Sequence, residues 1–444
     1  MTDLQRILPT VPQLSGLSSL VRYANQPLKR FEDARSLSER ATAFEVFGRY
    51  HLTLFAPELI ESVLVGEHAA FCKGVFVRDL GLTLLGDGLI TTHGAEWRRQ
   101  RKRTAPSLQR AEMAVYADQI VECTQEFLSA VPTGQAFDAH SSMMRLTLDI
   151  LVRTLFGGEI SRAREVEEAL AGVMSEYTPV RLTLRTCLPR WATVVSRRRI
   201  ARGRRALDSV LMQLISERKQ SGCSGSDLMS RLMAASEAEG RALSDFELRD
   251  QTMTIFLAGH ETSALTLTYI LRLLALHPQA QARVRQEIRH VFGGRRPAIQ
   301  DLPALTFTRA VLDEALRLFP PVWAIARETI ADCNVGELAC PAGSEVIILP
   351  WVMQRDPRYF DQPELFRPER WLTKSALPRG VYMPFGAGPR VCIGAHFAVV
   401  EALLVLAVLL SDGQFEMQQG PLLKLVPSIT LRPSGPVRMR FNRV

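Results

Sequence analysis

The longest regular pattern of apolar and polar positions runs from Ser244 to His277 and predicts one long helix. Ser244 and Glu247 have the spacing of a capping box at its start, and Pro278 follows its last residue. At a rise of about 1.5 Å per residue this helix is roughly 50 Å long, enough to cross a whole domain. Its middle, IFLAGHETSALTL, is too apolar for a surface helix, so we expect it to run through the core.

Shorter patterns predict further helices and small sheets. The other expected helices are Gln279–Phe292, Leu302–Phe319 and Ala395–Leu410. Short strands are expected in two regions of alternation and prolines, Val335–Leu349 and Leu425–Phe441. The apolar segment at Ala395 is too short for a bilayer and contains Glu401, which favours a buried core helix. The predicted fold class is therefore mainly α with small β-sheets.

Composition limits the class of protein. The 444 residues are 47% hydrophobic and 23% charged, which is typical of a globular chain with a large core. Without repeats or linkers, residues 1–444 are expected to form a single domain. Seven scattered cysteines indicate a reducing compartment, and the N-terminus has neither a signal-peptide pattern nor a membrane-anchor pattern, so we expect a cytoplasmic protein. The net charge of +8 suggests attraction to an acidic partner, anionic lipid or nucleic acid.

The most informative stretch is the loop from Pro384 to Gly394, in which glycines and a proline surround Cys392 just before an apolar helix. A glycine-rich loop that leads into a helix can direct several N–H groups at a sulfur atom and so stabilise a thiolate. The alternative is a buried, inert cysteine, which is the usual fate of a single one.

The loop resembles, residue for residue, the haem-binding loop of the cytochromes P450, through Phe385, Gly388, Arg390, Cys392 and Gly394. The resemblance implies the P450 fold, with the long helix crossing haem b (heme, iron protoporphyrin IX), and Cys392 as the ligand of the iron. It also implies an enzyme, a monooxygenase that uses O2, with Phe385 and Gly386 beside the cofactor. Thiolate ligation is the property by which this family favours O–O cleavage.

A second motif lies in the middle of the long helix, where Ala258-Gly-His-Glu-Thr262 resembles the oxygen-activation motif of the same family. Gly259 inside a helix costs about 1 kcal/mol relative to alanine, and a hydroxyl that bonds backward can distort the hydrogen-bond ladder. The resemblance implies that a local groove here holds dioxygen and that Ala258 lies beside the cofactor. The resemblance implies that Thr262 assists oxygen activation and that Glu261 relays protons. The alternative is a packed polar pair without a catalytic role. The intact pair is similar to monooxygenases rather than to the peroxide-using branch.

The remaining family motifs concern structure and cofactor binding. Glu314 and Arg317, at i and i+3, together with Arg370, resemble a buried Glu-Arg-Arg cluster of structural function. Trp97 and Arg101 lie one helical turn apart and resemble the helix that binds a haem propionate. The resemblance adds Arg327 and Arg390 as further propionate partners, since arginine binds carboxylates with two parallel hydrogen bonds.

Two basic segments bear on partners. Arg98, Arg99, Lys102 and Arg103 lack the aromatic residues and motifs of nucleic-acid binding, so we interpret them as a docking face for an acidic ferredoxin or flavodoxin. The chain has no flavin or nicotinamide fingerprint, so NAD(P)H is expected to act only through such a partner. The cluster 197–205 is interpreted as a solvated helix start, with contact to a membrane surface as the alternative.

The expected substrate is a hydrophobic small molecule of secondary or fatty-acid metabolism: a fatty acid, a terpenoid or a polyketide. Its contacts are expected at eight apolar positions that could equally be ordinary core: Phe76, Val77, Leu80, Phe256, Ala258, Val322, Trp323 and Ile325. Two other functions stay open: a haem-thiolate peroxygenase, isomerase or dehydratase that needs no reductase, and a non-enzymatic haem sensor or carrier. A monomer is expected.

Overall fold

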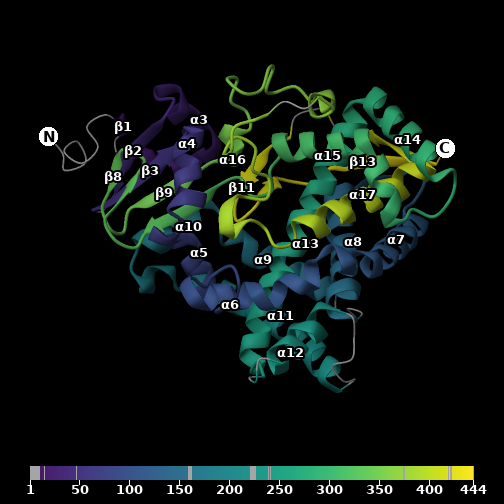
Figure 1. Cartoon of the computed structure of the whole chain (residues 1–444), viewed down its shortest axis with the longest axis horizontal. Helices are drawn as coiled ribbons and strands as arrows, with labels where there is room; N and C mark the ends of the chain where they lie inside the picture. The colour runs from purple at the N-terminus through teal and green to yellow at the C-terminus, as the bar shows by residue number, and fades with distance from the viewer. Residues whose placement is uncertain are drawn as a thin grey trace.

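The computed structural model describes residues 11–443 except 15, 47, 159–162, 221–226, 239, 241, 374–375, 419 and 421–422. Helices dominate one side of the molecule and a twisted sheet with short helices lies on the other (Figure 1). The predicted fold class is confirmed.

The long helix is α13 (Asp245–Leu276), and it runs through the core as predicted. Ser244 is its N-cap, and the capping box with Glu247 is present. Most of its residues are buried, and it packs on α8 (Ala139–Leu151), α11 (Val194–Gln220), α15 (Thr306–Leu318) and α17 (Ala395–Asp412).

The other helices surround this axis. Their bounds are α2 (Gly16–Asn25), α3 (Pro27–Leu37), α4 (Pro57–Glu61), α5 (Val75–Leu80), α6 (Gly94–Thr104), α7 (Met113–Ala130), α9 (Ala163–Ser175), α10 (Pro179–Cys187), α12 (Leu228–Ala238), α14 (Pro278–Phe292) and α16 (Pro350–Met353).

The start predicted for the helix Leu302–Phe319 is wrong. A 3₁₀ segment occupies Ile299–Ala304, with Pro303 inside it, and α15 begins only at Thr306. Proline restricts the residue before it and cannot donate to the helical ladder, which explains the break. The carboxylate of Glu287 then caps α15 by accepting from the backbone nitrogens of Phe307 (2.7 Å) and Thr308 (2.8 Å).

The strands of the described residues form four sheets, and short strands lie in both predicted regions. The largest has the order β1-β2-β3-β9-β6-β4, and a second has the order β10-β13-β5. β11 pairs with β12, and β7 pairs with β8. The bounds are β1 (Gln13–Leu14), β2 (Ala41–Val46), β3 (Arg49–Leu54), β4 (Phe71–Lys73), β5 (Ala136–Asp138), β6 (Ile325–Thr329), β7 (Cys333–Val335), β8 (Leu338–Cys340), β9 (Glu345–Ile348), β10 (Gly413–Met417), β11 (Leu425–Pro427), β12 (Leu431–Pro433) and β13 (Arg438–Arg443).

Helix α17 is the predicted apolar core helix, two residues longer than expected. Among the described helices it alone is long and apolar enough to cross a membrane, judged by length and composition. Most of that segment is buried against other elements, including α7 and α14, which is the environment of a core helix in a folded domain.

The second basic cluster lies in the first half of α11. Two of its arginines form ion pairs: the exposed Arg199 with the buried carboxylate of Glu176 (3.2 Å), and Arg204 with Asp208 (3.5 Å). Trp191, just before this helix, is 79% exposed. Both interpretations of the cluster, a solvated helix start and a membrane-facing surface, fit these positions.

Candidate active site

A cavity of about 730 Å³ lies between α13, the loop that contains Cys392, and strand β6. Apolar side chains provide most of its wall. Cavities of this size with a few convergent polar groups are typical of sites for small molecules.

The Cys392 loop is fixed by its backbone. The N–H of Cys392 donates to the carbonyl of Phe385 (2.9 Å), and the N–H of Val391 donates to that of Gly388 (3.0 Å). Gly388 has φ +69°, and a Cβ at this position would overlap the carbonyl oxygen of Leu64. A side chain at position 388 is therefore excluded both by the backbone conformation and by the close approach of the backbone of Leu64.

Cys392 lies deep in the protein and yet is exposed, because its accessible surface faces the cavity. Burial raises the pKa of the Cys392 thiol. The backbone N–H of Gly394 and the positive charge of Arg101 act on the pKa in the opposite direction. Both groups lie where they would stabilise a thiolate bound to a metal ion.

Four cations converge on the same wall: Lys73, Arg101, Arg327 and Arg390. Burial lowers the pKa of Lys73 well below its ordinary value and the pKa of Arg327 to about 10, and for Lys73 the neighbouring arginines add to the effect. Nη1 of Arg390 is buried without a hydrogen-bond partner, and its guanidinium lies 4.0 Å from the centre of the Trp97 ring. Among the described residues no carboxylate pairs with any of the four, so this wall is suited to bind an anion.

Helix α13 forms the opposite wall. Ala258 is exposed to the cavity, and a Cβ on Gly259 would lie 2.7 Å from Cδ1 of Leu151 on α8. The hydroxyl of Thr262 donates to the carbonyl of Ala258 (2.6 Å), the backward bond expected from the sequence. Glu261 and Thr262 both line the cavity.

A family model for cytochrome P450 matches residues 9–441. The chain belongs to the cytochrome P450 family. The cyclooctatin synthase of Streptomyces melanosporofaciens is 36% identical over 391 residues, which cover 86% of this chain and 84% of that protein. The pentalenene oxygenase of Streptomyces avermitilis is 32% identical, with 87% and 86% covered, and a cyclooctat-9-en-7-ol 5-monooxygenase of S. melanosporofaciens is 34% identical, with 80% and 78% covered.

As a P450 monooxygenase the protein is an oxidoreductase that uses haem and dioxygen. The cavity fits this cofactor on two independent observations. The thiol of Cys392 faces the cavity from a loop that leaves no room for a side chain at position 388. The two propionate groups of a haem can bind to the four cations of the wall, none of which pairs with a carboxylate of the described residues.

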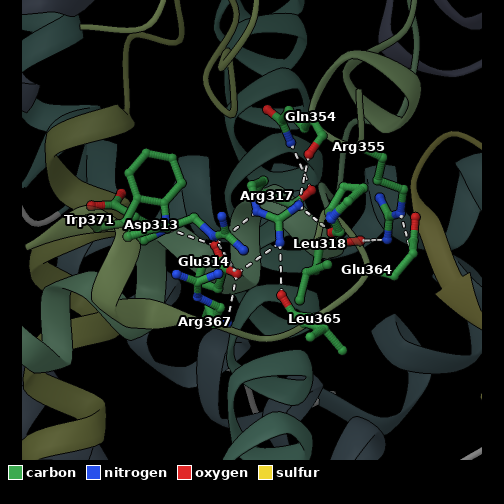
Figure 2. A network of polar contacts seen from close by, with 12 residues as sticks. Asp313, Glu314, Arg317, Leu318, Gln354, Arg355, Glu364, Leu365, Arg367 and Trp371 are labelled. Atoms are coloured by element: carbon green, nitrogen blue, oxygen red, sulfur yellow. Dashed lines mark hydrogen bonds and ion pairs between the residues drawn. The ribbon is translucent and has the colours of Figure 1, made fainter. Parts of the chain in front are cut away.

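The Glu-Arg-Arg cluster of this P450 is assembled around Glu314, which is fully buried together with Arg317 (Figure 2). Arg317 donates to both carboxylate oxygens at 2.8 Å, and Arg370 donates to Oε1 at 3.1 Å. Trp371 also donates to Oε2 at 2.8 Å. Although burial acts to raise it, the pKa of Glu314 is lowered by these partners.

Arg317 also links the cluster to the following loop. Its Nη1 donates to the carbonyls of Gln354 (2.9 Å) and Pro363 (2.6 Å), and its Nη2 donates to that of Leu365 (3.2 Å). Both carboxylate oxygens of Glu314 and all three guanidinium nitrogens of Arg317 thus have partners (Figure 2), whereas Nη2 of Arg370 is buried without a hydrogen-bond partner among the described residues. The geometry is that of a structural cluster outside the cavity.

Seven of the eight expected substrate contacts line the cavity, and one does not. Phe256 is 1% exposed and packs against Phe156 and His260. It precedes Ala258 by two residues, which is about 200° around the helix, so the two side chains lie on opposite faces. Phe256 is therefore a core residue. The others keep their expected place: Phe76, Val77, Leu80, Ala258, Val322, Trp323 and Ile325.

The basic docking face is smaller than the sequence indicates. Arg103 is 6% exposed, and Arg99 forms an ion pair with Glu96 on its own helix. Arg98 and Lys102 are exposed on α6, whose Arg101 donates to the carbonyl of Val391 (2.9 Å) in the Cys392 loop. The exposed positive charge beside this loop therefore includes Arg98 and Lys102.

The sequence did not predict that Lys73 and Glu401 line the cavity. Nothing in the short strand around Lys73 marks it before β4 pairs with β6 and sets it opposite Arg327. Glu401 was noticed as a carboxyl in an apolar helix. It is 2% exposed, lines the cavity and accepts a hydrogen bond from the hydroxyl of Ser263 on α13.

Glu401 gives this P450 a specific pH dependence of stability. Burial raises the pKa of Glu401 to about 8 from 4.5, although the bond from Ser263 acts in the opposite direction. Between these values the unfolded carboxyl is ionised while the folded one keeps its proton, so the free energy of unfolding falls as the pH rises. We expect Glu401 to contribute a fall of about 4 kcal/mol between about pH 4.5 and 8.

The matched variant for this prediction is Glu401→Gln, which has no proton to lose and still offers an oxygen to Ser263. Urea unfolding of the haem-loaded wild type and variant at about pH 5 and about pH 8 measures the difference. Parallel pH dependences in the two proteins would contradict the prediction.

Proposed function

We propose that the protein hydroxylates or epoxidises a hydrophobic cyclic terpenoid, in the cytoplasm, with electrons from a separate redox partner. The three relatives described above are named for cyclooctatin and pentalenene metabolism, which is terpenoid chemistry. The observation that carries the proposal is the cavity itself, which has a largely apolar wall and a thiol at its base. A fatty acid or a polyketide is the alternative substrate.

The overall reaction inserts one atom of dioxygen into a C–H bond of the substrate. Two electrons and two protons reduce the other atom to water, and the external partner supplies the electrons. Haem, when bound, supplies the iron at which dioxygen is reduced.

The side chains of the protein have separate tasks in this proposal. Cys392 binds the iron, and Trp97, Arg101, Arg327 and Arg390, joined by Lys73, bind the propionates. The apolar side chains exclude water and orient the substrate toward α13. Thr262 offers a hydroxyl at the groove beside Ala258, and Glu261 carries protons to it.

The test of the function is turnover by the purified haem protein with a surrogate ferredoxin, its reductase and NADH. Pentalenene and palmitic acid are suitable probes for the two substrate classes. Oxygenated pentalenene is the expected product, and oxygenation of palmitic acid alone would overturn the terpenoid assignment. Turnover without reductase would favour a peroxygenase or isomerase, and specific binding of pentalenene without oxygen consumption would favour a sensor or carrier.

The docking of the redox partner gives a separate prediction. We expect Arg98→Glu together with Lys102→Glu to slow the reduction of the haem by an acidic ferredoxin about tenfold, because the charges steer the encounter. Arg198→Glu, an exposed charge on α11, is the control. Stopped-flow reduction at low ionic strength measures the rate, and an unchanged rate in the double variant would remove α6 from the docking surface.

A further inference from the structure

Glu261, beside Thr262 on α13, is held in an asymmetric way. It is 3% exposed, and its Oε1 accepts a hydrogen bond from the hydroxyl of Thr430 (2.6 Å) and forms an ion pair with Nε of Arg432. Oε2 receives no hydrogen bond from the described residues, and the residue lines the cavity. One oxygen of the carboxylate is therefore fixed while the other is left for water or a proton.

Arg432 is the counter-ion of this carboxylate. The other titratable groups around the pair are His140 and Asp138 from α8 and its start, and His260 and Tyr269 from α13. Burial lowers the pKa of His140 and brings the pKa of His260 to about 4, so both rings are neutral near pH 7. Burial raises the pKa of Tyr269 above its ordinary range, so its hydroxyl is also neutral.

Arg432 is itself held by a well-anchored hairpin, β11–β12. The hydroxyl of Tyr269 donates to the carbonyl of Leu431 (2.5 Å), and the N–H of Leu431 donates to that of Pro321 (2.9 Å). At the turn, Nε1 of Trp323 donates to the carbonyl of Ser428 (2.9 Å). The guanidinium thus extends from a backbone fixed on both sides, and its side chain is only 18% exposed.

The hairpin turn also lines the cavity, through Ser428, Ile429 and Thr430. One short segment therefore contributes to the wall of the substrate site and to the hydrogen bonding of the acid. A carboxylate held at one oxygen keeps a single orientation, and proton transfer depends steeply on orientation and distance.

We propose that Arg432 is a positioning residue for proton delivery: its ion pair fixes Oε1 of Glu261, so that Oε2 faces the cavity and carries the protons that oxygen reduction consumes. The inference rests on the proposed monooxygenase function and assigns a residue outside the family motifs. Arg432 does not touch the substrate cavity and acts through Glu261. Without the guanidinium, a buried carboxylate has lost its counter-ion, and the neutral acid becomes the favoured form.

The first test does not depend on turnover. We expect infrared difference spectra of haem-loaded Arg432→Gln minus wild type, at about pH 7, to show a new C=O stretch of a protonated carboxyl. The double variant Glu261→Gln/Arg432→Gln must lack this band, which assigns it to Glu261. Arg432→Lys keeps the positive charge and should match the wild type.

The second test measures the use of electrons. With pentalenene, NADH and the surrogate redox proteins, we expect Arg432→Gln to lower the yield of product per NADH about tenfold, with hydrogen peroxide released instead, and to raise the solvent isotope effect. Arg432→Lys should restore most of the yield. Arg438→Gln, an exposed arginine on β13, is the matched control for loss of charge.

Two results would overturn the proposal: no new carboxyl band in Arg432→Gln, or a product yield and an isotope effect equal to those of the wild type. A lower melting temperature of Arg432→Gln without these changes indicates a purely structural ion pair and also overturns it. If the wild type itself forms no product, the proposed function has failed, and the infrared comparison still decides the role of Arg432.

Discussion

Cys392→Ala is expected to abolish the thiolate-type Soret absorption of the reduced, carbon monoxide-bound protein, and with it monooxygenase turnover. Alanine removes the one sulfur atom that the loop directs into the cavity, together with the electron donation that favours O–O cleavage. The four cations remain, so some haem can still bind through its propionates. The variant therefore separates iron ligation from retention of the cofactor.

The control is Cys333→Ala in the β7–β8 hairpin, a partly buried thiol that does not line the cavity. It should keep the spectrum and the turnover of the wild type. A thiolate-type band that persists in Cys392→Ala would contradict the assignment of Cys392 as the iron ligand and, with it, the proposed chemistry.

Glu314→Ala and Arg317→Ala are expected to give little soluble, haem-loaded protein. Each change leaves a fully buried opposite charge without its main partner, which costs roughly 3–5 kcal/mol. That loss is a large part of the 5–15 kcal/mol typical of a folded domain. Removal of Arg317 also leaves the carbonyls of Gln354, Pro363 and Leu365 without its donors (Figure 2).

Arg309→Ala on the same helix is the matched control. Arg309 pairs with Asp313 at i, i+4 and is 46% exposed, so its removal should cost about 0.5 kcal/mol. The measurement is the ratio of Soret absorbance to protein, together with the urea midpoint. Normal haem content in either cluster variant would contradict the prediction.

The sequence predicted the elements whose ends are marked by local chemistry. Ser244 and Glu247 define the start of α13, and Gly293, with φ +55°, closes α14. The start of α15 was wrong because Pro303 breaks the pattern inside a 3₁₀ segment, and because the cap of α15 comes from Glu287 on another helix, which no local pattern reveals. Phe256 was assigned to the substrate site from its place in the chain, whereas the rotation of the helix turns it into the core.

The candidate site was predictable where a contiguous motif carries it. The Cys392 loop and Ala258-Gly-His-Glu-Thr262 are such motifs, and both line the cavity. The positions of Lys73 and Arg432 were not predictable from local patterns. The pairing of β4 with β6 sets Lys73 opposite Arg327, and the hairpin β11–β12 brings Arg432 to Glu261. The same limit explains Arg103, which reads as surface charge in the sequence and lies buried in the fold.

The wall of unpaired cations has a consequence for the production of this protein. Arg327 and Arg390 act on each other through like charge, and no carboxylate among the described residues pairs with either of them. Binding of the two haem propionates at this wall is therefore expected to add to the free energy of unfolding. Cells that are starved of iron or of porphyrin precursors should therefore yield less of the folded protein, and feeding 5-aminolevulinate should raise that yield.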